Sequence, residues 1–133
     1  RPSTPWAIVP RMARILLVDD EDCILRTTAI LLEAEGYSTV CVLNGKEAQN
    51  QLENTEFDLM ITDIRMTPMD GMELIKITRV KKPGMPIIVI SAYCSDKTAQ
   101  EALALGAARY IRKPFKIDEI LSAIKGALAT AKR

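Results

Sequence analysis

The chain alternates short apolar runs with segments of helical length, and this alternation constrains its fold more than any other feature. Five short runs of strand-forming residues, most of them apolar, are each followed by a stretch long enough for a helix; they are residues 15–18, 39–42, 59–62, 86–90 and 108–111. Uninterrupted apolar runs are typical of strands that are buried on both faces of a parallel sheet. The sequence therefore predicts an α/β domain with helices on both sides of the sheet.

The helical segments carry their own start and stop signals. Asn44 and Glu47 have the spacing of a capping box, and Gly36 and Gly106 stand where helices end. We expect helices over 22–35, from 44, from 71 to about 80, from 95 or 96 to 106, and from about 117. The apolar faces are expected to hold Ile24, Leu31 and Leu32 in the first helix, and Ile117, Ile120, Leu121, Ile124 and Leu128 in the last.

Composition limits the classes of function. With 133 residues, of which 48% are hydrophobic, one domain with a real core is expected. The net charge of +1 disfavours direct binding to nucleic acid or to an anionic membrane. The sequence contains no histidine, which excludes an imidazole base and a His-ligated zinc ion.

The cysteines and the chain ends bear on location and domain limits. Cys23, Cys41 and Cys94 are too few and too widely spaced for a disulfide framework, which favours a reducing cytoplasm. No apolar stretch reaches the roughly 18 residues of a membrane span. Residues 1–11 contain three prolines and no regular period, so we expect a flexible extension there, vector-derived or upstream, and one domain over residues 12–133.

Polar residues end four of the five apolar runs. Asp19 and Asp20 follow the first, Asp63 the third, Ser91 the fourth and Lys113 the fifth. In an open parallel sheet, ligands bind beyond the carboxyl ends of the strands, where the strand order switches. This pattern predicts the flavodoxin-like, doubly wound order 2-1-3-4-5, with five helices and with the second strand at an edge.

These residue types point to phosphoryl chemistry. Three carboxylates in one crevice repel each other unless a cation is present, and a few hard oxygen ligands suit Mg²⁺. A carboxylate can act as a nucleophile and form an aspartyl phosphate, whose oxygens Mg²⁺, Lys113 and the Ser91 hydroxyl could share.

Each of these residues also has an ordinary structural explanation. Asp19 and Asp20 would favour the start of a helix, Asp63 and Ser91 are common turn residues, and Lys113 would be a surface lysine. The joint pattern, with polar residues at one edge of the sheet, favours a functional site over these separate explanations.

The motifs resemble the receiver domains of two-component response regulators from Met12 to about Ala131. By that resemblance Asp63 is the phosphoacceptor, and Ser91 and Lys113 contact the phosphoryl group. Mg²⁺ would be held by Asp19, Asp20, Asp63 and the Arg65 carbonyl, and the peptide bond before Pro114 would be cis. The motifs that carry the resemblance are residues 15–21, 63–71, 91–92 and 113–115.

The same resemblance implies a partner and an output surface. The phosphoryl donor would be a sensor histidine kinase or a histidine phosphotransfer protein, and the chain would be a signalling switch that catalyses only its own phosphorylation and slow dephosphorylation. The output face, from about Ser95 to Leu128, would carry Tyr110 as a switch aromatic, act on an effector domain or target protein, and offer a dimer contact. An aromatic residue in a short strand is, however, more often simple packing.

Two other classes of protein fit the motifs less well. A Mg²⁺-dependent hydrolase of the haloacid-dehalogenase kind needs Asp-x-Asp after the first strand, whereas this chain has adjacent Asp19 and Asp20. A flavin-binding flavodoxin relative needs a phosphate-cradling loop there, and acids repel phosphate unless a metal intervenes. The sequence leaves open whether the receiver stands alone or belongs to a larger regulator or hybrid kinase.

Overall fold

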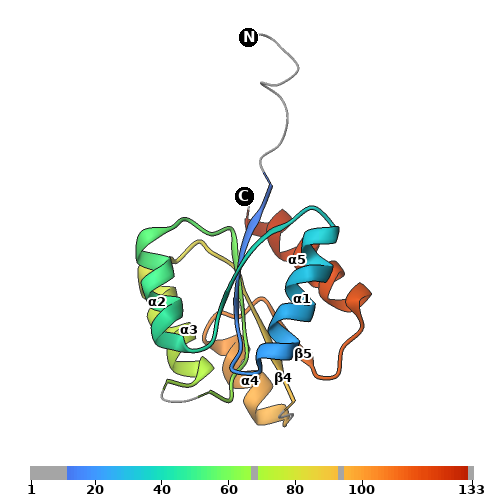
Figure 1. The fold of residues 1–133 in the computed structure, drawn as a ribbon. Helices are drawn as coiled ribbons and strands as arrows, with labels where there is room; N and C mark the ends of the chain where they lie inside the picture. The colour runs from blue at the N-terminus through green and yellow to red at the C-terminus, as the bar shows by residue number, and fades with distance from the viewer. Residues whose placement is uncertain (1–11, 67–68, 93–94, 132–133) are drawn as a thin grey trace.

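A computed structural model of the chain describes residues 12–66, 69–92 and 95–131. Within these residues five strands and five helices alternate, and the strands form one parallel sheet in the order β2-β1-β3-β4-β5 (Figure 1). The predicted fold class and strand order are confirmed. The elements are β1 (Arg14–Val18), α1 (Asp22–Ala34), β2 (Ser38–Val42), α2 (Gly45–Asn54), β3 (Leu59–Thr62), α3 (Gly71–Lys81), β4 (Ile87–Ser91), α4 (Asp96–Ala104), β5 (Arg109–Arg112) and α5 (Ile117–Ala131).

The sheet separates two hydrophobic cores, since alternate side chains of a strand point to opposite faces. On one face, α2, α3 and α4 pack against residues such as Leu16, Met60 and Val89. On the other, α1 and α5 cover residues such as Leu17 and Ile88 (Figure 1). The central strands β1, β3 and β4 are almost wholly buried, which explains why their sequences read as continuous apolar runs.

The buried face of α1 differs from the predicted one. Leu25, Ala29 and Leu32 point into the core, as their spacing of four and three residues requires. Leu31 is 39% exposed and Ile24 is only partly buried, so the prediction was right for Leu32 and wrong for the other two. Apolar residues cover more than one side of this helix, and their spacing alone did not identify the side that packs.

Helix ends follow the expected signals. Asn44 is the N-cap of α2 and accepts a hydrogen bond from the backbone of Glu47, whose own side chain accepts from the backbone N–H of Leu43 rather than from that of Asn44. Gly36 and Gly106 have φ values of 96° and 110°, the left-handed conformation that favours glycine after a helix. The sequence therefore located these helix ends to within a residue or two.

Gly71 lets α3 begin directly against the end of β3. Its backbone N–H donates to the carbonyl of Ile64 at 2.7 Å. A β-carbon at this position would lie 2.1 Å from the carbonyl oxygen of Asp63, which is far inside van der Waals contact. The start of α3 therefore rests on the backbone of the residue that follows β3.

Some sequence-based expectations fall outside the described residues. The proposed extension over residues 1–11 and the cysteine Cys94 belong to that group. Cys23 and Cys41 are exposed free thiols. Among the described helices, none is long and apolar enough to cross a membrane.

Replacing Leu32 by alanine should reveal which side of α1 stabilises the fold. Leu32 is fully buried, so Leu32→Ala should lower the free energy of unfolding by about 2–5 kcal/mol through lost burial and a cavity. The neighbouring Leu31→Ala is the matched control and should cost less than about 1 kcal/mol. Urea titrations measure both values, and equal losses would contradict this assignment of the helix face.

Replacing Gly71 by alanine should strain the junction between β3 and α3. We expect Gly71→Ala to lower the free energy of unfolding by about 3 kcal/mol, because the added carbon meets rigid backbone. Gly126 lies in α5 with open space where a β-carbon would project, so Gly126→Ala should stabilise the protein by about 0.5–1 kcal/mol. Thermal melts of the two variants should move in opposite directions, and a neutral Gly71→Ala would be inconsistent with the close approach.

Candidate functional site

Asp63 stands at the first position after β3, and backbone groups hold its side chain. The residue is buried, with 6% of its surface exposed. Its Oδ1 accepts hydrogen bonds from the backbone N–H groups of Ile64, at 2.6 Å, and Arg65, at 3.3 Å. Its own N–H donates to the carbonyl of Val18 at the end of β1. The carboxylate of Asp63 is therefore fixed in direction by the local path of the chain.

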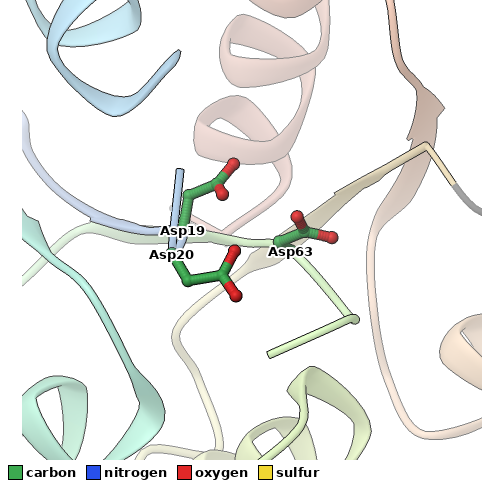
Figure 2. A group of neighbouring side chains, drawn as sticks. All are labelled: Asp19, Asp20 and Asp63. Atoms are coloured by element: carbon green, nitrogen blue, oxygen red, sulfur yellow. The ribbon is translucent and has the colours of Figure 1, made fainter. Parts of the chain in front are cut away.

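Asp19 and Asp20 follow β1 directly and bring two more carboxylates to the same edge. The Oδ1 of Asp19 accepts from the backbone N–H of Glu21 at 2.9 Å, which ties it to the start of α1. Asp19 is buried, whereas Asp20 is exposed. Figure 2 shows the side chains of Asp19, Asp20 and Asp63 gathered at this end of the sheet.

Lys113 joins the acids from beyond the end of β5. Its Nζ donates to the Oδ2 of Asp19 at 2.8 Å and to the Oδ2 of Asp63 at 2.9 Å. It also donates to the Oε1 of Glu21 at 3.1 Å. The side chains of Lys113, Asp19 and Asp63 are at most 10% exposed, so these charges interact with little screening by solvent.

Burial and the neighbouring polar groups shift two pKa values. Burial raises the pKa of Asp19, against the hydrogen bonds it accepts from Lys113 and from the Glu21 backbone, and the charge of Asp63 adds to the rise. Burial alone would lower the pKa of Lys113, but its hydrogen bonds to Asp19, Asp63 and Glu21 outweigh it and raise the pKa. The stability that Lys113 contributes is therefore present at neutral pH and is lost only as the pH rises above 10.5, its ordinary value.

Ser91 and Tyr110 lie on the neighbouring strands β4 and β5. Ser91 is the last residue of β4 and is fully buried, and its carbonyl accepts a hydrogen bond from the backbone N–H of Lys113 at 2.9 Å. The peptide bond between Lys113 and Pro114 is cis, as expected. Tyr110 is half-buried and packs against the core that α2, α3 and α4 cover.

The acids form a group that fits a divalent metal. Asp19, Asp20 and Asp63 each offer a carboxylate oxygen, and these oxygens lie within 4.8 Å of one another. Asp20 and Arg65 also line an open cleft of about 410 Å³ beside the group. Carboxylate oxygens in this number suit Mg²⁺, which keeps several of its waters.

The structure brings together the acids and the lysine that the sequence singled out, and it adds one residue. Asp19, Asp63 and Lys113 are in direct contact, and Asp20 lies beside them. In the sequence, Glu21 stood out only as the last residue of the motif 15–21, yet its side chain reaches Lys113. The position of Glu21 directly after Asp20 was the one feature of the sequence that could have indicated this contact.

Comparisons with known proteins agree on one family. The response regulator receiver domain matches residues 15–125 of the chain. Regulatory protein AtoC of Escherichia coli K12 is 38% identical over 115 residues, which are 86% of this chain and 25% of AtoC. This chain therefore spans about a quarter of the length of that relative.

Solved structures show the same relationship. A CheY-like receiver domain protein from Methanospirillum hungatei superposes with a TM-score of 0.88 at 34% identity, over 92% of this chain and 98% of that one. TrrA from Thermotoga maritima, solved in complex with Mg²⁺ and BeF, has a TM-score of 0.80 at 34% identity, over 87% and 99% of the two chains. Since the family match spans well over half of the sequence, this chain belongs to the receiver domains of two-component response regulators.

Proposed function

We propose that this receiver domain is a phosphorylation-controlled switch whose phosphoacceptor is Asp63. The observation that carries the proposal is the geometry of its carboxylate, which backbone N–H groups hold on one oxygen and Lys113 contacts on the other. This arrangement is that of an oriented nucleophile beside a fixed positive charge. These 133 residues contain no histidine, so a phosphohistidine donor would lie outside them, on a histidine kinase or a phosphotransfer protein.

In the proposed reaction, a carboxylate oxygen of Asp63 attacks the phosphorus of the phosphohistidine. The new O–P bond forms as the N–P bond breaks, and the bonding electron pair returns to the imidazole nitrogen of the partner. The backbone N–H groups of Ile64 and Arg65 keep the Asp63 carboxylate in line during this attack. The Lys113 ammonium is close enough to donate to an oxygen of the transferred group.

The acidic group supports a role for Mg²⁺ in this transfer. We infer that Asp19, Asp20, Asp63 and the carbonyl of Arg65 would hold the ion, on the evidence of the clustered carboxylates and the adjacent cleft. When bound, Mg²⁺ would neutralise charge on the transferring oxygens. The similar protein TrrA was solved in complex with Mg²⁺ and BeF, which supports a role for Mg²⁺ in this domain.

We further propose that the output surface is the face formed by α4, β5 and α5. The support is the backbone hydrogen bond between Lys113 and Ser91, which links the site to the ends of β4 and β5. Ser91 would contact the phosphoryl group, and Tyr110 would change its packing. The relatives that share this domain are transcriptional regulators, so an effector domain or target protein would read this face. A dimer through the same face, a domain limit at residue 12 and a cytoplasmic location stay predictions.

Phosphorylation of Asp63 should need both the carboxylate and the metal. With acetyl phosphate and Mg²⁺, the intact protein should gain one phosphoryl group, and Asp63→Asn or removal of Mg²⁺ should reduce this to background. Asp70→Asn is the matched control. Asp70 lines the same cleft as Asp20 and Arg65, and it is the N-cap of α3, a role that Asn fills equally well. Intact-protein mass spectrometry gives the measurement, and wild-type labelling of Asp63→Asn would rule out Asp63 as the acceptor.

Removing the Ser91 hydroxyl should uncouple phosphorylation from the output face. Ser91→Ala should still accept phosphate at Asp63, but amide NMR shifts around residues 95–112 should change less than half as much as in wild type. The reason is that a ligand shifts a conformational equilibrium only through contacts that differ between the two states. Ser91→Thr keeps a hydroxyl and should restore the response. Equal shifts in wild type and Ser91→Ala would show that Ser91 does not transmit the change.

A further inference from the structure

The ammonium of Lys113 has an acceptor for each of its three N–H bonds. Asp19, Asp63 and Glu21 accept at 2.8, 2.9 and 3.1 Å. A lysine ammonium has three protons to donate. If Lys113 is to contact an oxygen of the incoming phosphoryl group while Asp63 is still a free carboxylate, one of these three hydrogen bonds has to be given up.

Glu21 differs from the other two acceptors in its surroundings. Its side chain is 58% exposed, whereas those of Asp19 and Asp63 are 10% and 7% exposed. Its contact with Lys113 is also the longest of the three. An ion pair with one solvent-exposed partner is worth little, and a released Glu21 carboxylate would be hydrated at small cost. Before transfer, Asp63 is still a carboxylate, and releasing Asp63 or Asp19 would take a buried charge from Lys113, which costs more than hydrating the exposed Glu21 carboxylate.

The side chain of Glu21 also does not cap the helix that Glu21 begins. Glu21 is the N-cap of α1, but its side chain makes no capping hydrogen bond. It lies instead, with Lys113, at the edge of an apolar groove of about 580 Å³ between α1 and the segment after β5, which gives it open space to turn into. Its observed orientation therefore serves the contact with Lys113.

We propose that Glu21 is a positioning residue that holds the Lys113 ammonium before phosphorylation and gives up its place to a phosphoryl oxygen. This inference rests on the proposed function of Asp63 and Lys113. While Glu21 is in contact it occupies the third N–H of Lys113 and adds negative charge where an anionic donor must approach. Glu21 therefore slows phosphorylation of Asp63, and its removal makes Lys113 available.

The test is the rate of Asp63 phosphorylation by acetyl phosphate with Mg²⁺, followed on the full chain by intact-protein mass spectrometry. Glu21→Gln should raise this rate about two- to fivefold, the range expected for loss of a weak ion pair. Asp22→Asn is the matched control, because Asp22 is the next residue, is 55% exposed and pairs with Arg26 instead of Lys113. The phosphorylation rate of Asp22→Asn should stay within about 1.5-fold of the wild-type rate, because solvent screens an exposed surface charge.

A second measurement separates positioning from a general effect on the fold. The NMR signal of the Lys113 side-chain ammonium in the unphosphorylated protein should shift in Glu21→Gln and stay unchanged in Asp22→Asn. Glu21→Asp, which keeps the charge but shortens the reach by one methylene, should shift the Lys113 signal as Glu21→Gln does, and it should accelerate phosphorylation less, because its negative charge stays near the donor. A purely structural role would instead lower the melting temperature and slow phosphorylation.

The outcomes distinguish this inference from the proposed function. If wild type is not labelled at Asp63, the proposed function itself fails. If wild type is labelled and Glu21→Gln is no faster, or if Asp22→Asn accelerates it equally, only the role of Glu21 is overturned. Acceleration in Glu21→Gln and Glu21→Asp but not in Asp22→Asn supports the inference.

Discussion

The Lys113 ammonium holds two buried carboxylates that would otherwise repel each other, and the geometry at this end of the sheet depends on that contact. Its side chain bridges Asp19 after β1 and Asp63 after β3. Its backbone N–H binds the carbonyl of Ser91, so the same residue also ties the site to β4. The carboxyl ends of β1, β3, β4 and β5 are thus connected through one residue. Because a buried charge without a partner is costly, these strand ends cannot shift independently while the ions stay paired.

Most of the fold could be predicted because the three central strands, β1, β3 and β4, are buried on both faces. Full burial turns a strand into an uninterrupted apolar run, and the expected runs match the observed strands to within one residue at each end. The location of the site could be predicted from the same runs, because a polar residue that ends such a run lies at the edge of the sheet where ligands bind. Asp19, Asp63 and Lys113 were found in this way although 94 residues separate the first from the last.

What the sequence did not reveal depends on contacts between distant side chains and on backbone packing. The apolar residues of α1 occupy more than one side of the helix, so Leu31 could not be distinguished from Leu32 without knowing where α5 and the sheet lie. The contact between Glu21 and Lys113 joins residues 92 positions apart and depends on the conformations of two long side chains. The tight approach of Gly71 to the Asp63 carbonyl has no signature beyond a glycine at the start of a helix.

The two cores on either side of the sheet differ in the order in which synthesis can complete them. The core beneath α2, α3 and α4 draws on residues up to Ala107, with Tyr110 packed against it. The other core joins the beginning of the domain, including Ile15 and Leu25, to α5 at its end. A chain that emerges from the ribosome with its N-terminus first can close the former while the latter still lacks its cover. The side of β3 and β4 that α5 contacts therefore remains exposed until α5 has been made, and a nascent chain halted before α5 would present this apolar surface to chaperones.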